Sequence, residues 1–327
     1  MQSLYPFTFK AVFKEKIWGG QKIREILGMD FGQLPNCGET WLLSGVQDDP
    51  TVVENGYLSG NELNELVEVF MGDLVGEAVY ERFGDVFPIL VKIIDSNDWL
   101  SIQVHPDDAL AQRRGIGMGK TEMWYVMQAD KDAELISGFN RQLTKSDYLE
   151  AMEKGEIKAL MNYETVEKGD VFFIPAGRVH ALGPGTLIAE IQQTSDTTYR
   201  IYDWDRIDQA GQMRELHTAE AIDAIDFKLP DTAKTAYQKK ENETTNMVKS
   251  PFFTTNYLQF KAGIRKDYSQ LDSFVILLCT EGSCNIDWGF EDKIELEKGQ
   301  TVLIPNTIQA VALYPNKSCT LLEVYIE

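Results

Sequence analysis

The sequence predicts a mainly β protein made of two jelly-roll barrels with short helical insertions. Three observations support this fold class. Short alternating apolar runs recur along the chain and are broken by Gly, Pro, Asn and Asp, which is typical of β sandwiches and barrels. A glycine turn, a strand of five residues and a proline occur twice, at 167–175 and at 297–305, which indicates two related barrels. Two other segments have the spacing of helices.

The individual elements follow from these patterns. The clearest strands of the first barrel are expected at 41–44, 87–95, 100–105, 122–127 and 170–175. Those of the second barrel are expected at 252–260, 273–279, 283–288, 300–304 and 319–326. Helices are expected at about 61–83 and 144–161, because apolar residues recur there every three or four positions. Ser146 is the candidate N-cap of the second helix.

The domain organisation follows from a change in composition. Residues 1–230 are expected to form an N-terminal catalytic domain that carries both helical insertions. Residues 231–250 are polar and weakly patterned, which predicts a linker. Residues 251–327 are expected to form a C-terminal barrel without a metal site, because this part of the chain contains no histidine.

Composition narrows the classes of function. The chain has 327 residues and a formal charge of -20, which argues against a nucleic acid or an anionic membrane as partner. No stretch approaches the roughly 20 apolar residues of a membrane span, and the first residues do not resemble a signal peptide, so we expect a cytoplasmic protein. The four cysteines lack CxxC spacing and are expected to be reduced and mostly buried.

Two of the three histidines lie in contexts typical of metal ligands. His180 ends the pattern glycine, five residues, Pro-x-Gly-x-x-His, which resembles the second half-motif of the cupin fold. Gln103 and His105 are two residues apart, so both side chains point to one face of a strand. Glu122, at the start of the next strand, is the strongest choice for a carboxylate ligand, since two histidines and one carboxylate form a common catalytic metal set.

Other polar residues have simpler explanations. His217 lacks a ligand-like context and is expected to be structural or exposed. Asp107 and Asp108 follow a proline and are expected to serve as turn and cap residues. His105 alone would be a structural histidine, so the metal interpretation depends on its occurrence together with His180.

Longer motifs extend these residues to a family. The chain closely resembles the class I (zinc-dependent) mannose-6-phosphate isomerases, in their short bacterial form, over nearly its whole length. The resemblance is carried in order by 17–20 (IWGG), 38–41 (GETW), 100–108 (LSIQVHPDD), 119–125 (GKTEMWY), 174–183 (IPAGRVHALG), 190–196 (EIQQTSD) and 198–206 (TYRIYDWDR).

The resemblance implies one zinc ion per chain and a set of site residues. The implied zinc ligands are Gln103, His105, Glu122 and His180. It also implies an essential arginine at Arg200, a substrate-facing lysine at Lys120 and a phosphate-contacting serine at Ser101. Longer relatives carry a lysine six residues after the essential arginine. Arg206 stands at that position here, and we expect it to bind the substrate phosphate, as guanidinium chemistry allows.

The implied reaction interconverts D-mannose 6-phosphate and D-fructose 6-phosphate through an enediol. Arg200 and Lys120 would stabilise the enediolate oxygens together with zinc. Glu190 and a zinc-bound water are the two candidate bases, and Glu190 could instead orient a ligand or Arg200. A non-catalytic cupin that binds sugar phosphates and an iron cupin oxygenase are the competing functions. The expected partner is the small sugar phosphate, and the protein is expected to be a monomer or a homodimer.

Overall fold

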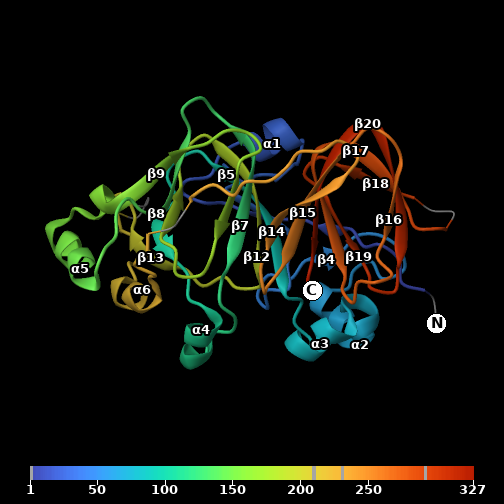
Figure 1. The fold of residues 1–327 in the computed structure, drawn as a ribbon, viewed down its shortest axis with the longest axis horizontal. Helices are drawn as coiled ribbons and strands as arrows, with labels where there is room; N and C mark the ends of the chain where they lie inside the picture. Colours follow the sequence, from blue (N-terminus) through green and yellow to red (C-terminus); the bar gives the residue numbers. More distant parts are fainter. Residues whose placement is uncertain (1–2, 208–210, 230–231, 291–292) are drawn as a thin grey trace. The chain divides into compact units, whose positions relative to one another are not determined.

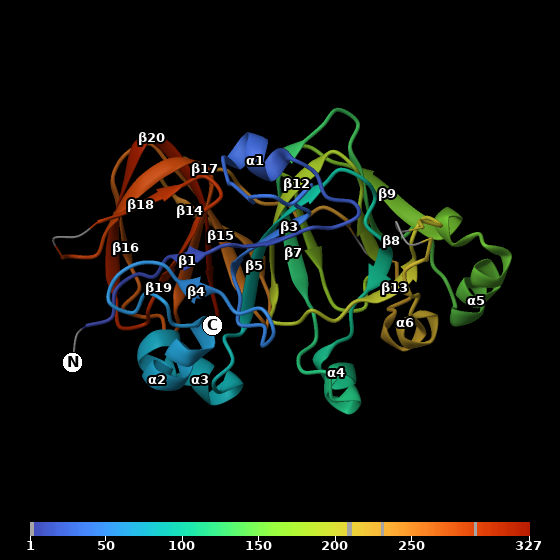
Figure 2. The same ribbon diagram turned by 180° about the vertical axis from the view of Figure 1, so that it is seen from behind.

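The computed structural model of the chain describes residues 3–207, 211–229, 232–290 and 293–327 (Figures 1 and 2). Antiparallel strands dominate it, and the helices of the described residues are short, which confirms the predicted fold class. The chain divides into two compact units. A middle unit contains Phe13–Thr40 and Ile93–Thr235, and a terminal unit contains Met1–Val12, Trp41–Lys92 and Ala236–Glu327.

Two sheets carry the strands of the middle unit. Their orders are β13-β6-β11-β8-β9 and β10-β7-β12-β5-β3-β2, and the chain passes between the units within β2, β3 and β5. The strands are β2 (Val12–Lys14), β3 (Glu39–Leu43), β5 (Ile89–Ser96), β6 (Ile102–Val104), β7 (Glu122–Ala129), β8 (Glu134–Phe139), β9 (Met161–Thr165), β10 (Val171–Ile174), β11 (His180–Leu182), β12 (Thr186–Gln193) and β13 (Tyr199–Tyr202).

The helices of the middle unit are α1 (Lys22–Leu27), α4 (Asp108–Arg114), α5 (Lys145–Lys154) and α6 (Thr218–Ala224), with a 3-10 turn η1 (Ile157–Leu160). The predicted N-cap Ser146 is wrong. Thr144 caps α5 instead, because its hydroxyl accepts from the Asp147 backbone while Asp147 bonds back to Thr144. Asp107 caps α4 by accepting from Leu110 N at 2.7 Å, as its predicted cap role requires.

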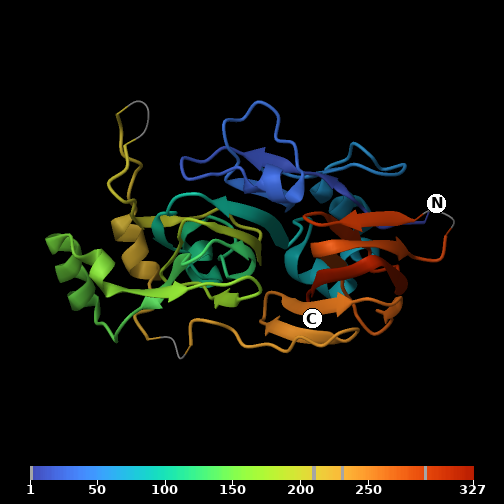
Figure 3. The ribbon, with the colours of Figure 1, turned by 90° about the horizontal axis from the view of Figure 1, so that it is seen from above.

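Residue alternation along the five-stranded sheet separates core from site. Figure 3 shows α5 and α6 beside β8, β9 and β13. Alternate residues of the sheet, including Ile102 and Val104, pack in one hydrophobic cluster with Tyr148 of α5 and Ala221 of α6. Because successive side chains of a strand point to opposite faces, Gln103 faces the interior of the unit. Burial of the apolar face under the helices therefore fixes which side chains point inward.

The terminal unit combines strands from both ends of the chain with the first helical insertion. A two-stranded sheet pairs β1 (Phe9–Lys10) with β4 (Val52–Val53). The main sheet has the order β14-β15-β20-β17-β18, with β16 on β20 and β19 on β17. Its strands are β14 (Thr244–Lys249), β15 (Thr254–Phe260), β16 (Ile264–Asp267), β17 (Val275–Asp287), β18 (Ile294–Glu297), β19 (Thr301–Ile304) and β20 (Ala310–Tyr325).

The first helical insertion forms α2 (Leu63–Val75) and α3 (Glu77–Phe83), with a left-handed residue, Met71, inside α2. The backbone N–H groups of Glu77 and Ala78 donate to the Asp272 carboxylate at 2.9 and 3.0 Å. A carboxylate from the C-terminal part of the chain therefore caps α3, where an anion is favoured by the exposed N–H groups of a helix start. None of the helices in the described residues is long and apolar enough to cross a membrane.

The division into units differs from the predicted domain boundaries. Residues 41–92 and 1–12 cluster with the C-terminal strands, whereas 1–230 was expected to form one domain. The expected boundary at 230–231 lies outside the described residues. Part of the expected linker 231–250 is the strand β14, which pairs with β15. The expected strands 273–279 and 283–288 are one strand, β17, which continues through bulges on β20.

The interior of the terminal unit contains a buried polar cluster. Glu323 is 2% exposed and accepts hydrogen bonds from Tyr268 Oη at 2.8 Å and from Asn256 Nδ2 at 3.1 Å. Lys266 Nζ forms an ion pair with the same carboxylate at 2.8 Å.

The four cysteines are free and buried, as predicted.

The repeated glycine-strand-proline pattern forms β10 and β19, which occupy corresponding places. Ile174 at the end of β10 pairs with Glu122, and Ile304 at the end of β19 pairs with Val275. The terminal unit thus has valine where the middle unit has a carboxylate.

Candidate metal centre

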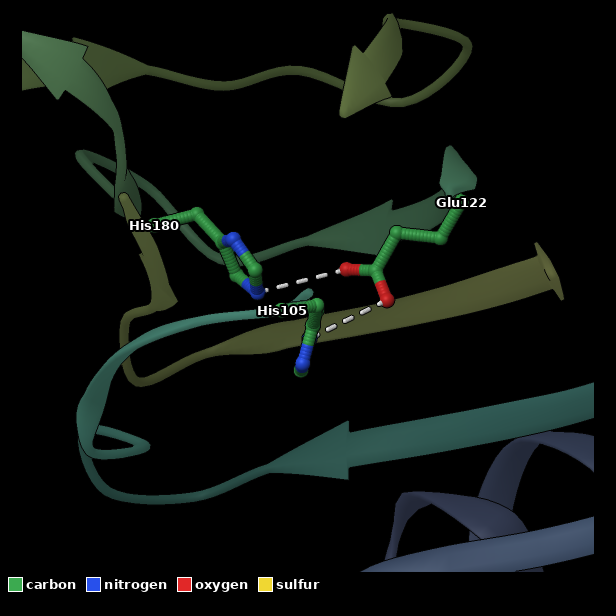
Figure 4. Close-up of side chains that lie close together, drawn as sticks. All are labelled: His105, Glu122 and His180. Carbon is green, nitrogen blue, oxygen red and sulfur yellow. Dashed lines mark ion pairs between the residues drawn. The ribbon is translucent and has the colours of Figure 1, made fainter. Parts of the chain in front are cut away.

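Three side chains converge inside the middle unit from separate strands. His105 follows β6, Glu122 begins β7 and His180 begins β11, and all three are buried. One ligand atom of each lies within 4.8 Å of the other two. Figure 4 shows the imidazoles near the Glu122 carboxylate, with His105 Nε2 3.5 Å from Oε2 and His180 Nε2 3.3 Å from Oε1. Within the described part of the chain, no other group of histidine, cysteine and acidic side chains converges in this way.

Strand pairing explains why these side chains meet. Gln103 pairs with His180 on one side and with Arg200 on the other, and His180 pairs with Ser137. Directly paired residues place their side chains on the same face of a sheet, so these four residues form one row across four strands. The Pro-x-Gly turn before β11 is bonded to the chain that follows β6, because Gly177 N donates to His105 O at 3.0 Å. Gly177 adopts a φ of 90°, which favours glycine.

Both imidazoles are oriented by backbone carbonyls. His105 Nδ1 lies 2.9 Å from Thr197 O, and His180 Nδ1 lies 2.9 Å from Arg178 O. A carbonyl can only accept, so each Nδ1 carries the proton and each Nε2 presents its lone pair to the cluster. Burial, reinforced by the charges of Lys120 and Arg178, lowers the pKa of His180 to about 3. An imidazole that is protonated at Nδ1 and turns Nε2 toward the cluster is the form that binds a metal ion.

The Glu122 carboxylate gives the cluster its negative charge. Its side chain is 1% exposed, and neither oxygen accepts a hydrogen bond from the described residues. The Lys120 ammonium nitrogen lies 3.1 Å from Oε2 and forms an ion pair with it, but the geometry is not that of a hydrogen bond. A buried carboxylate with unfilled acceptor positions beside two imidazole lone pairs fits a divalent cation. The donor set therefore suits a metal ion bound by nitrogen and oxygen.

Gln103 borders the cluster through its amide nitrogen. Nε2 lies 3.3 Å from His180 Nε2, and Oε1 accepts from Ser101 Oγ at 3.5 Å. The amide oxygen is the atom that can bind a cation, so Gln103 joins the ligand set only with its amide turned over. Ser101 and Gln103 are two residues apart at β6, and the predicted phosphate contact therefore lies next to the predicted ligand.

Lys120 and Glu190 flank the cluster. Lys120 is buried, and its Nζ is 3.0 Å from His105 Nε2 as well as 3.1 Å from Glu122 Oε2. Glu190, on β12, is also buried and accepts from Trp124 Nε1 at 3.0 Å. The Trp124 ring meets the His180 ring edge to face, with centroids 5.3 Å apart. The structure thus brings both predicted residues into the shell around the two histidines.

Arg200 is held in the row by His217 and Glu215. The Arg200 backbone N–H donates to His217 Nδ1 at 3.1 Å, and His217 N donates to Arg200 O at 2.7 Å. Arg200 Nη1 donates to Glu215 O at 2.7 Å. Burial, followed by the nearby charge of Arg214, lowers the pKa of the Arg200 guanidinium. His217 therefore has a structural role, as its context predicted.

The guanidinium of Arg206, the predicted phosphate ligand, is bonded within the protein. All three of its guanidinium nitrogens bond to the protein: Nε to Asp203 O at 3.3 Å, Nη1 to Trp99 O at 2.6 Å and Nη2 to Asp203 Oδ1 at 2.5 Å. Sequence analysis missed Asp203 and Arg214, which form a second pair at this point. Arg214 stands three residues before His217, and its charge in an acidic chain was the only signal that could have marked it.

The fold and the site together define a mainly β, cupin-type protein with a buried candidate metal centre. A family model described as phosphomannose isomerase type I, catalytic domain, matches residues 7–168. A mannose-6-phosphate isomerase of Streptococcus mutans is 37% identical over 306 residues, covering 93% of this chain and 94% of that protein. The mannose-6-phosphate isomerase ManA of Bacillus subtilis is also 37% identical, covering 92% and 93%. The chain therefore belongs to the type I phosphomannose isomerase family.

Solved structures agree with this assignment. The crystal structure of a mannose 6-phosphate isomerase from Bacillus subtilis is 32% identical and covers 99% of this chain and 100% of its own, with a TM-score of 0.85. A phosphomannose isomerase variant from Salmonella typhimurium is 16% identical and covers 98% and 99%, with a TM-score of 0.80. At that identity the second likeness concerns the fold alone.

Proposed function

We propose that the protein interconverts D-mannose 6-phosphate and D-fructose 6-phosphate at a zinc ion held by Gln103, His105, Glu122 and His180. The observation that carries this proposal is the buried cluster of two imidazole lone pairs and one carboxylate. It lies in a chain whose relatives, at 37% identity over most of its length, are named mannose-6-phosphate isomerases. Four nitrogen and oxygen ligands suit zinc, and one position must stay open for substrate or water.

The reaction moves one proton between two carbons of the open-chain sugar. A base removes the C2 proton of the aldose, the electron pair of that bond forms the C1–C2 double bond, and the C1 carbonyl oxygen takes the negative charge. The base then returns its proton to C1, and the C2 hydroxyl proton passes to the C1 oxygen, which leaves the carbonyl at C2 and gives the ketose. Bound zinc supplies Lewis-acid stabilisation of the charged oxygens. The protein must supply further positive charge, a base and a binding site for the phosphate.

Lys120 and Arg200 are the cations proposed to stabilise the enediolate. The Lys120 ammonium already lies against the histidine and carboxylate of the cluster, and Arg200 stands one strand from Gln103 on the same face. Fixed charges in a site that excludes water act more strongly than they would in solution. Loss of either cation should therefore lower turnover more than it lowers substrate affinity.

Glu190 is the proposed base. Its carboxylate is held by the Trp124 indole, and it comes from β12, which pairs with β7, the strand that begins with Glu122. With His105 and His180 assigned to the metal and His217 bonded to the Arg200 backbone, the three histidines of the chain are all engaged. An orienting role for Glu190 toward Arg200 is the competing assignment, and it predicts a smaller loss of turnover.

A coupled assay for fructose 6-phosphate formed from mannose 6-phosphate tests the function. Zinc-loaded protein should turn over, chelation should abolish activity and added zinc should restore it. Oxygen consumption by iron-loaded protein, or binding of sugar phosphate without turnover by the zinc form, would favour the competing functions. Full isomerase activity in metal-free protein would remove the metal from the mechanism. The cytoplasmic location and the monomeric or dimeric state stay predictions.

A further inference from the structure

We propose that Arg214, oriented by Asp203, is the residue that binds the phosphate group of the sugar substrate. The inference deepens the proposed function and rests on it. Arg206 then has a structural role, in place of the phosphate contact that its position predicted. Arg206 and Arg214 both bond to the buried carboxylate of Asp203, and the charge of Arg200 acts together with theirs, so the three form an arginine cluster.

The cluster gathers positive charge around one buried carboxylate. Arg206 and Arg214 share Asp203, and Arg206 also lies 3.6 Å from the exposed carboxylate of Asp98. The chain as a whole has a formal charge of -20, so a local cationic site needs a specific cause. A phosphate monoester would pair with the Arg214 guanidinium, which shares its only carboxylate partner among the described residues with Arg206.

The hydrogen bonds distinguish Arg206 from Arg214. Each guanidinium nitrogen of Arg206 already donates to Trp99 or Asp203, and its side chain is only 12% exposed. Arg214 uses only one edge, with Nε 2.7 Å from Asp203 Oδ2 and Nη2 2.5 Å from Oδ1. Its Nη1 has no partner among the described residues, and its side chain is 29% exposed. Arg214 therefore keeps one whole guanidinium nitrogen, Nη1, without a bond to the described residues, whereas every guanidinium nitrogen of Arg206 already makes one.

Asp203 sets the direction of the open edge. A carboxylate that grips Nε and Nη2 side by side fixes the plane of the guanidinium, because both bonds lie in that plane. The remaining Nη1 and Nη2 hydrogens then point away from Asp203 as a second fork. Arginine binds carboxylates and phosphates through such forks. Because the side chain is ordered before the ligand arrives, less conformational entropy is lost on binding.

The arginine cluster lies at the end of the strand pair that carries the site. On β13 and β6, Arg200 pairs with Gln103 and Tyr202 pairs with Ile102. Ser101 comes directly before Ile102 in the chain, so it lies near the end of this strand pair. Trp204 Nε1 donates to Leu100 O at 2.7 Å, which keeps the chain after β13 beside the residues before β6. A sugar whose C1 and C2 lie at the metal cluster can therefore extend along this pair and place its 6-phosphate beside Ser101 and Arg214.

Steady-state kinetics of the zinc-loaded enzyme test the assignment. Arg214→Ala should raise KM for mannose 6-phosphate by about 10- to 100-fold, the effect of losing one charge-assisted contact. The inhibition constant of inorganic phosphate should rise by a similar factor, while kcat and the zinc content change little. Arg113→Ala is the matched control, since Arg113 is an exposed arginine of α4 in the same unit, and it should leave both constants unchanged.

Two further measurements separate binding from a structural role. The kcat/KM for unphosphorylated D-mannose should be the same in wild type and Arg214→Ala, because only the phosphate contact is lost. Arg206→Lys should lower thermal stability while its KM for mannose 6-phosphate rises less than that of Arg214→Ala. A KM for Arg214→Ala within about twofold of wild type, or equal losses with both sugars, would overturn the proposal.

Measuring ligand binding directly separates the phosphate site from the isomerase activity. Calorimetry with mannose 6-phosphate and with inorganic phosphate needs no turnover. If the zinc-loaded wild-type protein binds both ligands but does not isomerise, and Arg214→Ala weakens both, the isomerase function fails while the phosphate site stands. If wild type isomerises and Arg214→Ala binds both ligands as wild type does, the function stands and the phosphate site fails.

Discussion

Replacing Asp203 with Asn is expected to destabilise the middle unit by about 3 kcal/mol. Asp203 accepts three hydrogen bonds from guanidinium groups, two at Oδ1 and one at Oδ2. The amide nitrogen of Asn would face the Arg214 Nε–H, so one charge-assisted bond of about 1.5–3 kcal/mol is lost. The two bonds at Oδ1 would each keep roughly half of their strength, because their acceptor would be a neutral amide oxygen instead of a carboxylate. Partial exposure of Arg214 brings the sum down toward 3 kcal/mol.

Scanning calorimetry at pH 7 measures this effect, with Asp205→Asn as the matched control. Asp205 is exposed and accepts a hydrogen bond from the Tyr202 hydroxyl, and the side-chain oxygen of Asn can accept the same bond. Its φ of 54° also suits Asn. The melting temperature of Asp203→Asn should fall by about 5–10 °C, and that of the control by about 2 °C or less. Equal shifts in the two variants would refute the argument that Asp203 holds the arginines.

The stability that Asp203 contributes depends on pH, because its pKa differs between the folded and the unfolded protein. Burial favours the protonated carboxyl, but hydrogen bonds from Arg214 and Arg206 outweigh it and lower the pKa of Asp203. A group with a depressed folded pKa stabilises the protein above its unfolded pKa of about 3.9, and this stability is lost as the pH falls toward the folded pKa. The gap between wild type and Asp203→Asn should thus be constant from pH 7 to about 5 and narrow below about 4.

Three further predictions follow from the site and its supports. His180→Ala should lose both bound zinc, by atomic absorption, and turnover; a variant that keeps stoichiometric zinc would contradict the ligand assignment. Glu190→Gln should lower kcat by about 10²–10⁴-fold with zinc retained, and near wild-type turnover would show that Glu190 is not the base. Thr144→Ala should cost about 1 kcal/mol of stability as a lost helix cap, whereas Ser146→Ala should be close to neutral in the same unfolding assay.

The residues of the candidate metal centre could be predicted from the sequence because their signals are local. The two-residue spacing of Gln103 and His105 on a strand, and the Pro-x-Gly turn before His180, each fix a direction within a few residues. Glu122 followed from its place at the start of a strand. The structure brings the two histidines and this carboxylate together, with Gln103 at the border of the cluster.

The roles of the arginines could not be predicted in the same way. Spacing placed Arg206 at the position of a phosphate ligand, but spacing does not reveal that Trp99 and Asp203 already use its donors. Arg214 was missed because its pairing with Asp203 depends on a chain reversal that no periodic pattern marks. The grouping of 41–92 with the C-terminal strands was missed for a similar reason. Its contacts, such as Asp272 with the start of α3, join residues far apart in sequence.

The Lys266–Glu323 pair shows how a barrel can keep a buried carboxylate without a metal ion. In the terminal unit Lys266 and two hydrogen-bond donors occupy the Glu323 carboxylate. In the middle unit Glu122 also lies beside a lysine, Lys120, but neither of its oxygens accepts a hydrogen bond from the described residues, and two imidazoles stand next to it. With the proposed zinc site, zinc starvation should therefore stop catalysis while the terminal unit stays folded, because a covalently attached ammonium cannot be chelated.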